Sequence, residues 1–147
     1  MPKGPIDISF LGDRELEKKL RKLGDPRTQA SAARSALRDG AKVVLGESQR
    51  LVPVRTGRLK ESLKVRAFSA GSRKKRGEFG REVRTGTREE LGIAPDDPGY
   101  YPAAVEFGHG NVPPRSYLRA AAQNVKTEAL ATVRSALWRR IQQEARR

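Results

Sequence analysis

The sequence predicts an α+β fold in which a small antiparallel sheet of about three or four strands is packed by two long amphipathic helices. Apolar residues recur at the helical period over 28–52 and over 115–147, and they alternate with polar residues in parts of the segment 63–107. A chain of 147 residues, of which 36% are hydrophobic, has the size of one domain and can bury its own core. We therefore expect a single domain over residues 1–147.

Residues 1–25 are expected to form an N-terminal arm with a short helix. Three leucines recur there at helical spacing after Asp13, a suitable N-cap, and Gly24 ends the segment. These are Leu16, Leu20 and Leu23.

A long helix is expected over residues 28–52. Either Asp25 or Thr28 can cap it, and Pro53 ends it because proline lacks the backbone N–H that a helix interior needs. One stripe of this helix is small or apolar, which predicts the face toward the core. The stripe consists of Ala33, Leu37, Ala41, Val44, Leu45, Ser48 and Leu51.

A helical turn over residues 58–62 is followed by three segments that alternate like half-buried strands. The apolar positions are Leu63, Val65 and Ala67 in the first, Phe79, Val83 and Thr85 in the second, and Tyr101, Ala103, Val105 and Phe107 in the third. Between the first two lies a segment, 69–77, with small turn-forming residues and four consecutive cations. We expect it to be a mobile basic hairpin loop, because the cations repel one another.

The last element is predicted as one long helix over residues 115–147, since the segment contains neither glycine nor proline. Its apolar residues recur every three or four positions, which indicates an amphipathic helix. They are Leu118, Ala122, Val125, Ala129, Val133, Leu137 and Ile141.

The formal net charge of +14 is unevenly distributed along the chain. Residues 50–90 carry 13 basic and 5 acidic side chains and residues 115–147 carry 8 and 2, whereas residues 91–114 carry three acidic side chains and no Lys or Arg. This polarity suits a subunit that associates head to tail. A basic surface that only maintains solubility explains the charge equally well.

The sequence gives little support for catalysis, a metal or a cofactor, and we expect none of the three. Cysteine is absent, His109 stands alone between two glycines, and no phosphate-binding or nucleophile motif occurs. The acidic pairs 89–90 and 96–97 are typical of solvated loops. No apolar run reaches the roughly 18 residues that a membrane helix needs, and the N-terminus has no signal-type core, so no membrane contact is expected.

Two motifs stand out from this background. In LVPVRTGRLKESL, residues 51–63, a proline ends a helix, Thr56 can cap the next one, and Leu59 and Leu63 face inward. In YYPAAVEFGHG, residues 100–110, an alternating segment ends in Glu-Phe-Gly, and PPRSYLRAAA, residues 113–122, then starts a helix with Ser116 as a cap. Each motif alone is a turn between two elements.

In this order the segments resemble the small tail-completion or neck proteins of long-tailed phages, the family that includes proteins similar to the minor tail protein Z of phage lambda. The resemblance spans residues 28–140. It departs from the family pattern where Arg115 and Ser116 are inserted and where Ala120 replaces a common proline, and the segments 71–77 and 89–97 look peculiar to this chain. The matching residues are Pro53, Thr56, Gly57, Leu59, Ser62, Tyr101, Val105, Glu106, Phe107, Gly108, Pro114, Tyr117, Leu118 and Arg119.

The resemblance implies a structural virion protein, assembled in the host cytoplasm, that joins head and tail as a ring around the DNA channel and contacts other neck and tail proteins. It leaves open whether copies associate in solution. An acidic edge at 91–114 is expected to meet a basic face of the adjacent copy or of a neighbouring ring. A free basic nucleic-acid-binding protein is the alternative. Residues expected to touch DNA or a partner are Arg73, Lys74, Lys75, Arg76, Arg139 and Arg140.

Overall fold

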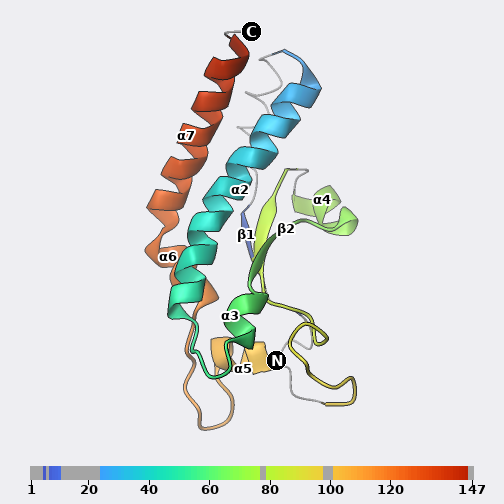
Figure 1. Cartoon of the computed structure of the whole chain (residues 1–147), viewed down its shortest axis with the longest axis vertical. Helices are drawn as coiled ribbons and strands as arrows, with labels where there is room; N and C mark the ends of the chain where they lie inside the picture. Colours follow the sequence, from blue (N-terminus) through green and yellow to red (C-terminus); the bar gives the residue numbers. More distant parts are fainter. Residues whose placement is uncertain (1–4, 6, 11–23, 77–78, 98–100, 146–147) are drawn as a thin grey trace.

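The computed structural model describes residues 5, 7–10, 24–76, 79–97 and 101–145 (Figure 1). Within these residues the chain is α+β, as predicted. A layer of two long helices lies against a small sheet, and short helices and loops lie at the lower end and beside the sheet. The elements are β1 (Asp7–Phe10), α2 (Pro26–Leu51), α3 (Arg58–Ser62), β2 (Lys64–Ala67), α4 (Ala70–Arg76), β3 (Arg81–Arg84), α5 (Tyr101–Phe107), α6 (Leu118–Asn124) and α7 (Lys126–Ala145).

The sheet is antiparallel with the strand order β1-β3-β2. β2 and β3 fall within the first two predicted strands, and Val65 lies opposite Val83 in their register. Val83 is fully buried because β3 is the central strand and α2 packs against the sheet. The other edge is β1, which pairs Ile8 with Val83. An N-terminal strand was not predicted, and the predicted helix containing Leu16, Leu20 and Leu23 lies outside the described residues.

α2 begins as its sequence predicts. Asp25 is the N-cap and accepts a hydrogen bond from the backbone N–H of Thr28 at 3.1 Å, and Pro26 occupies the first turn, where no N–H is needed. The helix ends at Leu51, two residues before Pro53. The predicted stripe is correct, because most of its members are buried and Leu45 and Leu51 are partly buried against the core.

The predicted C-terminal helix is two helices, α6 and α7, which are separated at Val125. Val125 has φ −113° and ψ 15°, which are not helical values, and this bends the chain without glycine or proline. Its N–H and its carbonyl still make hydrogen bonds of 3.1 and 2.8 Å with Ala121 and Ala129, so the two helices follow each other directly. The apolar stripe still faces inward. α7 packs along α2 through a cluster rich in alanine, whose small side chains let two helix backbones approach closely.

Two of the predicted elements are wrong. The third strand, 101–107, is the helix α5, which buries Pro102, Ala103 and Glu106. This i, i+1, i+4 spacing belongs to a helix, and Pro102 fits the first turn of a helix better than the interior of a sheet. The basic loop 69–77 contains the helix α4, whose charged side chains are exposed and separate by pointing away from the helix axis.

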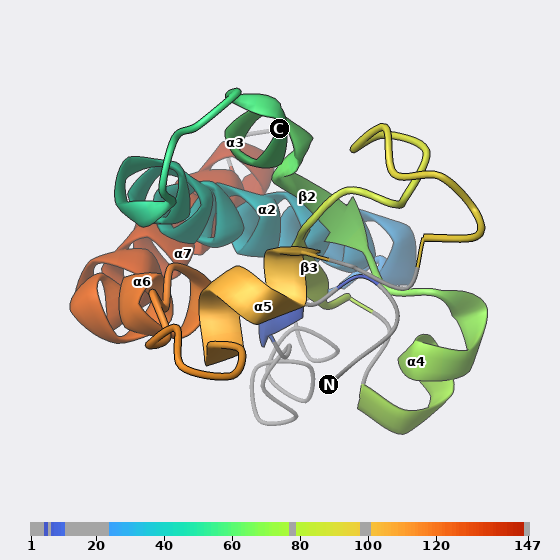
Figure 2. The same ribbon diagram turned by 90° about the horizontal axis from the view of Figure 1, so that it is seen from below.

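Seen from below, α7 and α4 lie on opposite sides of the molecule, with α2 and the sheet between them (Figure 2). α3 and α5 lie at the lower end, where the ends of the sheet and of the long helices meet. This end contains both of the motifs singled out in the sequence.

Candidate functional site

The lower end of the molecule is organised around the carboxylate of Glu106, whose side chain is 1% exposed. Glu106 comes from the last turn of α5 and points at the first turn of α6. Its oxygens accept hydrogen bonds from the backbone N–H groups of Tyr117, Leu118 and Arg119 at 2.8, 3.0 and 3.1 Å. A helix N-terminus leaves such donors unsatisfied and carries a partial positive charge. Glu106 therefore caps α6 from outside the helix.

Side chains from the start of α6 complete the bracket around this carboxylate. The hydroxyl of Ser116 donates to Glu106 Oε1 at 2.9 Å, and Nε of Arg119 donates to the same oxygen at 2.9 Å. Nη2 of Arg119 also donates to the backbone carbonyl of Glu106 at 3.0 Å. Ser116 is not the N-cap, which is Tyr117, but it supports the cap that Glu106 provides. We call Glu106, Ser116, Tyr117, Leu118 and Arg119 the Glu106 bracket.

The pKa of Glu106 reflects the competition between these contacts and burial. Burial favours the neutral acid and raises the pKa. The hydrogen bonds from Leu118, Tyr117 and Arg119 favour the carboxylate, and together they hold the pKa below its ordinary value. Glu106 is therefore an ionised structural group at neutral pH. It does not belong to an exposed acidic edge, as the sequence had suggested, since its oxygens are occupied within the chain.

The side chain of Tyr117 connects the start of α6 to the first turn of α5. Its ring is fully buried, and its hydroxyl donates to the carbonyl of Pro102 at 3.1 Å. The backbone N–H of Arg115 donates to the carbonyl of Val105 at 2.8 Å. α5 and the start of α6 are thus held together at both ends of α5.

An exposed segment projects from this bracket; it consists of Phe107, the last residue of α5, and the turn that follows, and we call it the loop 107–114. His109 and Val112 exchange two backbone hydrogen bonds of 3.1 and 2.9 Å, which close a tight turn. Gly108 has φ +79°, and a Cβ there would lie 2.9 Å from the carbonyl oxygen of Val112, so this position requires glycine. Phe107 and Val112 are 43% and 63% exposed. The guanidinium of Arg119 lies 4.6 Å from the centre of the Phe107 ring.

The motif at residues 51–63 builds the corner between α2 and β2. Gly57 is the N-cap of α3 with φ +80°, and Thr56 only accepts a long 3.4 Å hydrogen bond from the N–H of Arg58. The hydroxyl of Ser62 donates to the carbonyl of Leu59 and accepts from the N–H of Gly86, which follows β3. Ser62 therefore fixes the corner to the far end of the sheet.

Both motifs contribute to one core. Leu59 and Leu63 from the corner lie in the same buried cluster as Ala103, Tyr117 and Leu118 from the bracket. Tyr101 and Val105 pack against this cluster and are partly buried. Pro53 is also partly buried, and Pro114 is exposed in the loop. The sequence prediction missed Gly86 as the partner of Ser62 and Pro102 as the acceptor for Tyr117. The proline was visible in the sequence as a helix-start signal, whereas nothing near Ser62 pointed to Gly86.

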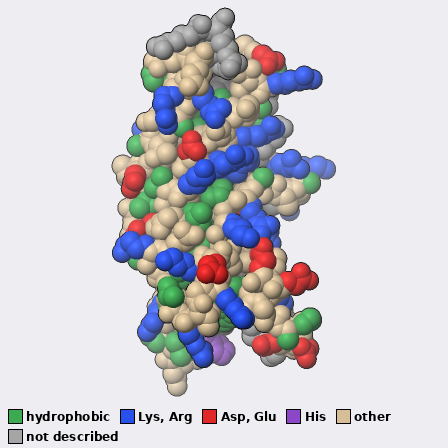
Figure 3. Space-filling model, viewed as in Figure 1, with side chains coloured by type: hydrophobic (Ala, Val, Ile, Leu, Met, Phe, Trp, Pro, Cys, Tyr) green, Lys and Arg blue, Asp and Glu red, His purple; other side chains and the backbone are tan. Residues whose placement is uncertain are grey.

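The structure separates the residues expected to touch DNA into two groups. Arg73, Lys74, Lys75 and Arg76 are exposed on α4, on the far side of the molecule from Arg139 and Arg140 of α7. Figure 3 shows basic side chains over much of one face and a group of acidic side chains at its lower right. The exposed acidic residues of the loop after β3 include Glu89 and Asp96.

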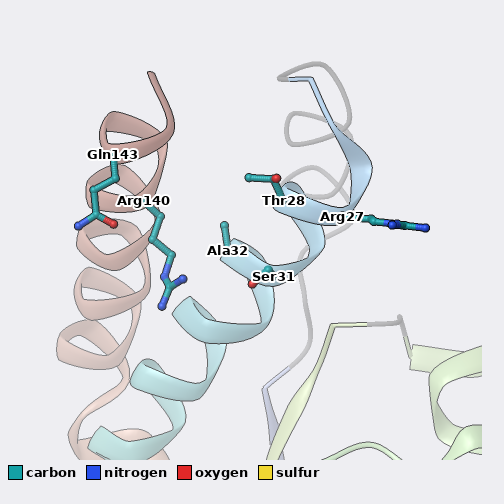
Figure 4. A pocket seen from close by; sticks show the side chains of 6 residues that line it. All are labelled: Arg27, Thr28, Ser31, Ala32, Arg140 and Gln143. Carbon is teal, nitrogen blue, oxygen red and sulfur yellow. The ribbon is translucent and has the colours of Figure 1, made fainter. Parts of the chain in front are cut away.

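A hollow of about 270 Å³ lies between the start of α2 and the end of α7 (Figure 4). Arg140 reaches into the gap and donates to Ser35 Oγ at 2.6 Å, whereas Arg27 points away from it. Thr28, Ser31, Ala32 and Gln143 complete the lining. In the described part of the chain no three carboxylate or imidazole groups converge in a way that could hold a metal ion.

None of the helices in the described ranges is long and apolar enough to cross a membrane. No curated protein and no solved structure matches this chain. A family model named HK97-gp10-like and described as "Bacteriophage HK97-gp10, putative tail-component" matches residues 14–108. The match covers more than half of the 147 residues and includes both the corner and Glu106. The chain therefore belongs to the HK97-gp10-like family of bacteriophage tail components.

Proposed function

We propose that this protein is a tail-completion or neck subunit, of the lambda protein Z type, that assembles as a ring and joins head and tail around the DNA channel. The family of phage tail components supports a location in the virion and contact with other tail proteins. The observation that supports a joining role is the Glu106 bracket. It uses a buried ionic network to hold an exposed, partly apolar loop, 107–114, at one end of the molecule.

A rigid loop of this kind suits docking to another protein, because little conformational entropy is lost when it binds. Its two exposed apolar side chains, Phe107 and Val112, offer contact area, and Gly108 and the His109–Val112 turn fix its shape. Nothing in this arrangement resembles a catalytic constellation. The carboxylate of Glu106 at its base already accepts hydrogen bonds from the start of α6, so the arrangement favours a structural protein over an enzyme.

The test is a phage in which the gene carries an amber codon, complemented by variants of the protein. Loss of the protein is expected to leave filled heads and separate tails in electron micrographs. The loop variant Val112→Asp should fail to restore joined particles while the purified protein keeps the wild-type melting temperature. The matched control Asn111→Asp, in the same loop, should restore them. Joined particles of normal yield without the protein would refute the proposed function.

The helix α4 is proposed to contact DNA or an acidic partner surface. Four exposed cations lie on seven residues there, and phosphate contacts by several cations weaken steeply with salt. Replacing Arg73, Lys74, Lys75 and Arg76 by Gln should abolish any salt-sensitive retention of duplex DNA in a gel shift. Tight DNA binding by a monomer that is absent from particles would instead favour the free nucleic-acid-binding protein.

A further inference from the structure

The outer face of α7 carries an exposed tryptophan. Trp138 is the only tryptophan of the chain and is 63% exposed. Leu130, which is 43% exposed, and the exposed residues Ala131, Arg134 and Ser135 precede it at helical spacings that place them on the same side of the helix. The opposite side of α7, with Ala129, Val133 and Leu137, packs on α2.

This composition is that of a protein interface. Tryptophan and arginine, with tyrosine, are enriched among the residues that dominate binding energy, and here an exposed tryptophan, an exposed leucine and an arginine lie on one helix. Arg134 precedes Trp138 by about one turn, and Arg139 lies at the edge of this side of α7, where it lines a hollow with Asp39 of α2; both make the face basic. We call Leu130, Arg134, Trp138 and Arg139 the Trp138 face.

On the opposite flank of the molecule α4 is basic, but the loop after β3 has the complementary charge. The loop 87–97 after β3 exposes Glu89 and Asp96, and Arg88 donates a hydrogen bond to the backbone carbonyl of Asp97, which helps to hold the loop in shape. Figures 1 and 2 both place this loop on the side away from α7. A basic apolar face and an acidic loop therefore point in opposite directions.

We propose that the Trp138 face docks against the acidic loop 87–97 of a second copy of the chain. This contact is heterologous, so each copy uses both surfaces and the chain of contacts closes into a ring when the rotation permits. The inference rests on the proposed function and names the surfaces that build its ring. Charge pairing between Arg134 or Arg139 and Glu89 or Asp96 sets the register of neighbouring copies, and burial of Trp138 supplies the apolar contact.

Cysteine cross-linking tests this contact without background, because the chain has no cysteine of its own. Ser135→Cys and Asp96→Cys are combined in one chain, and a short bis-maleimide is applied to assembled particles. Both positions are exposed, so neither change disturbs the core. A ladder of multimers is expected from the double variant only. The matched control pairs Ser135→Cys with Val54→Cys, which is exposed at the α2–α3 corner, and should give no ladder.

Charge reversal provides the second arm. Arg134→Glu and Asp96→Lys should each lower the yield of joined particles by roughly tenfold or more, since like charges then oppose every contact in the ring. The double variant should recover most of the yield.

Three outcomes would overturn the inference. Joined particles without a ladder would leave the proposed function intact and place the ring contact elsewhere. Dimers from Ser135→Cys alone would show that α7 pairs with α7. Salt-sensitive quenching of Trp138 emission by duplex DNA, with no cross-linking between copies, would assign this face to nucleic acid. Normal particles that lack the protein would instead refute the proposed function itself.

Discussion

Replacing Glu106 by Ala removes the central acceptor of the bracket and leaves its donors in place. Three backbone N–H groups at the start of α6 lose their partner, together with the Ser116 hydroxyl and the Arg119 guanidinium. The Leu118 and Tyr117 groups are buried, so water reaches them poorly. The change should therefore destabilise the folded chain far more than removal of a surface carboxylate.

Loss of a helix cap costs about 0.5–2 kcal/mol, and each buried donor left unsatisfied costs about 1–3 kcal/mol. Because Ser116 and Arg119 are partly exposed and can turn to solvent, we expect a total near 3 kcal/mol and not the full sum of these terms. At about 2–4 °C per kcal/mol for a chain of this size, the melting temperature should fall by about 6–12 °C. Glu106→Gln keeps one oxygen acceptor but loses charge assistance, so about half of this effect is expected.

The same group predicts a pH dependence. The folded-state pKa of Glu106 lies below the ordinary value, so its contribution is complete above the unfolded pKa, about 4.3, and is lost as the pH falls through the folded pKa. The difference in stability between wild type and Glu106→Gln should therefore be constant near neutral pH and shrink below about pH 4. The pKa of Glu47 is also lowered, to about 2, mainly by hydrogen bonds from Arg50 and Asn124. Its contribution to the pH dependence of stability is the same in both proteins, so it cancels in the difference.

The assay is denaturant unfolding followed by circular dichroism at a series of pH values. Glu89→Ala, an exposed carboxylate of the loop after β3, is the matched control and should stay within about 0.5 kcal/mol of wild type. A Glu106→Ala protein as stable as this control would show that the bracket does not hold α6. If the difference in unfolding free energy between wild type and Glu106→Gln grows as the pH falls, the pKa of Glu106 is raised on folding and not lowered.

Three further substitutions test other parts of the frame by the same unfolding measurement. Gly80→Ala places a Cβ 2.0–2.6 Å from three atoms of the buried Phe68 ring and should cost about 1–3 kcal/mol, of which Phe68→Leu should restore a part in the double variant. Ser62→Ala should cost about 1–2 kcal/mol, since it removes the acceptor for the N–H of Gly86. An unchanged stability would show that this hydrogen bond does not hold the corner to the sheet. Gly108→Ala should cost about 1–2 kcal/mol from the left-handed backbone alone; no loss would show that the loop relaxes freely.

The helical stripes of α2 and α7 could be predicted because each is long enough to show its period several times over. In α2, Ala33, Leu37, Ala41 and Val44 are all nearly or fully buried, as their spacing indicates. Short segments lack this redundancy. Over residues 101–107 the apolar residues fit both the helical period and the alternation of a strand. What distinguishes the two is the burial of Glu106, a charged residue that hydrophobic patterning counts as exposed.

The missed elements depend on contacts that are distant in the sequence. Glu106 satisfies donors 11–13 positions away, and Ser62 satisfies one 24 positions away. The break at Val125 has no local glycine or proline to announce it. The four like charges of α4 favour a loop in a reading of the sequence, but Lys and Arg have high helix propensity because they lose little side-chain freedom in a helix.

Of the fourteen residues that carry the family resemblance, five are buried and five are partly buried. Leu59, Ser62, Glu106, Tyr117 and Leu118 are all buried, and each fixes one element to another. The resemblance therefore describes a frame, and the frame alone does not determine which partner is bound. Partner choice must lie on exposed side chains outside the pattern, such as Val112 and Trp138, which are free to differ without disturbing the core. An engineered exchange of loop or helix face onto the same frame should then change the partner and leave the stability almost unaltered.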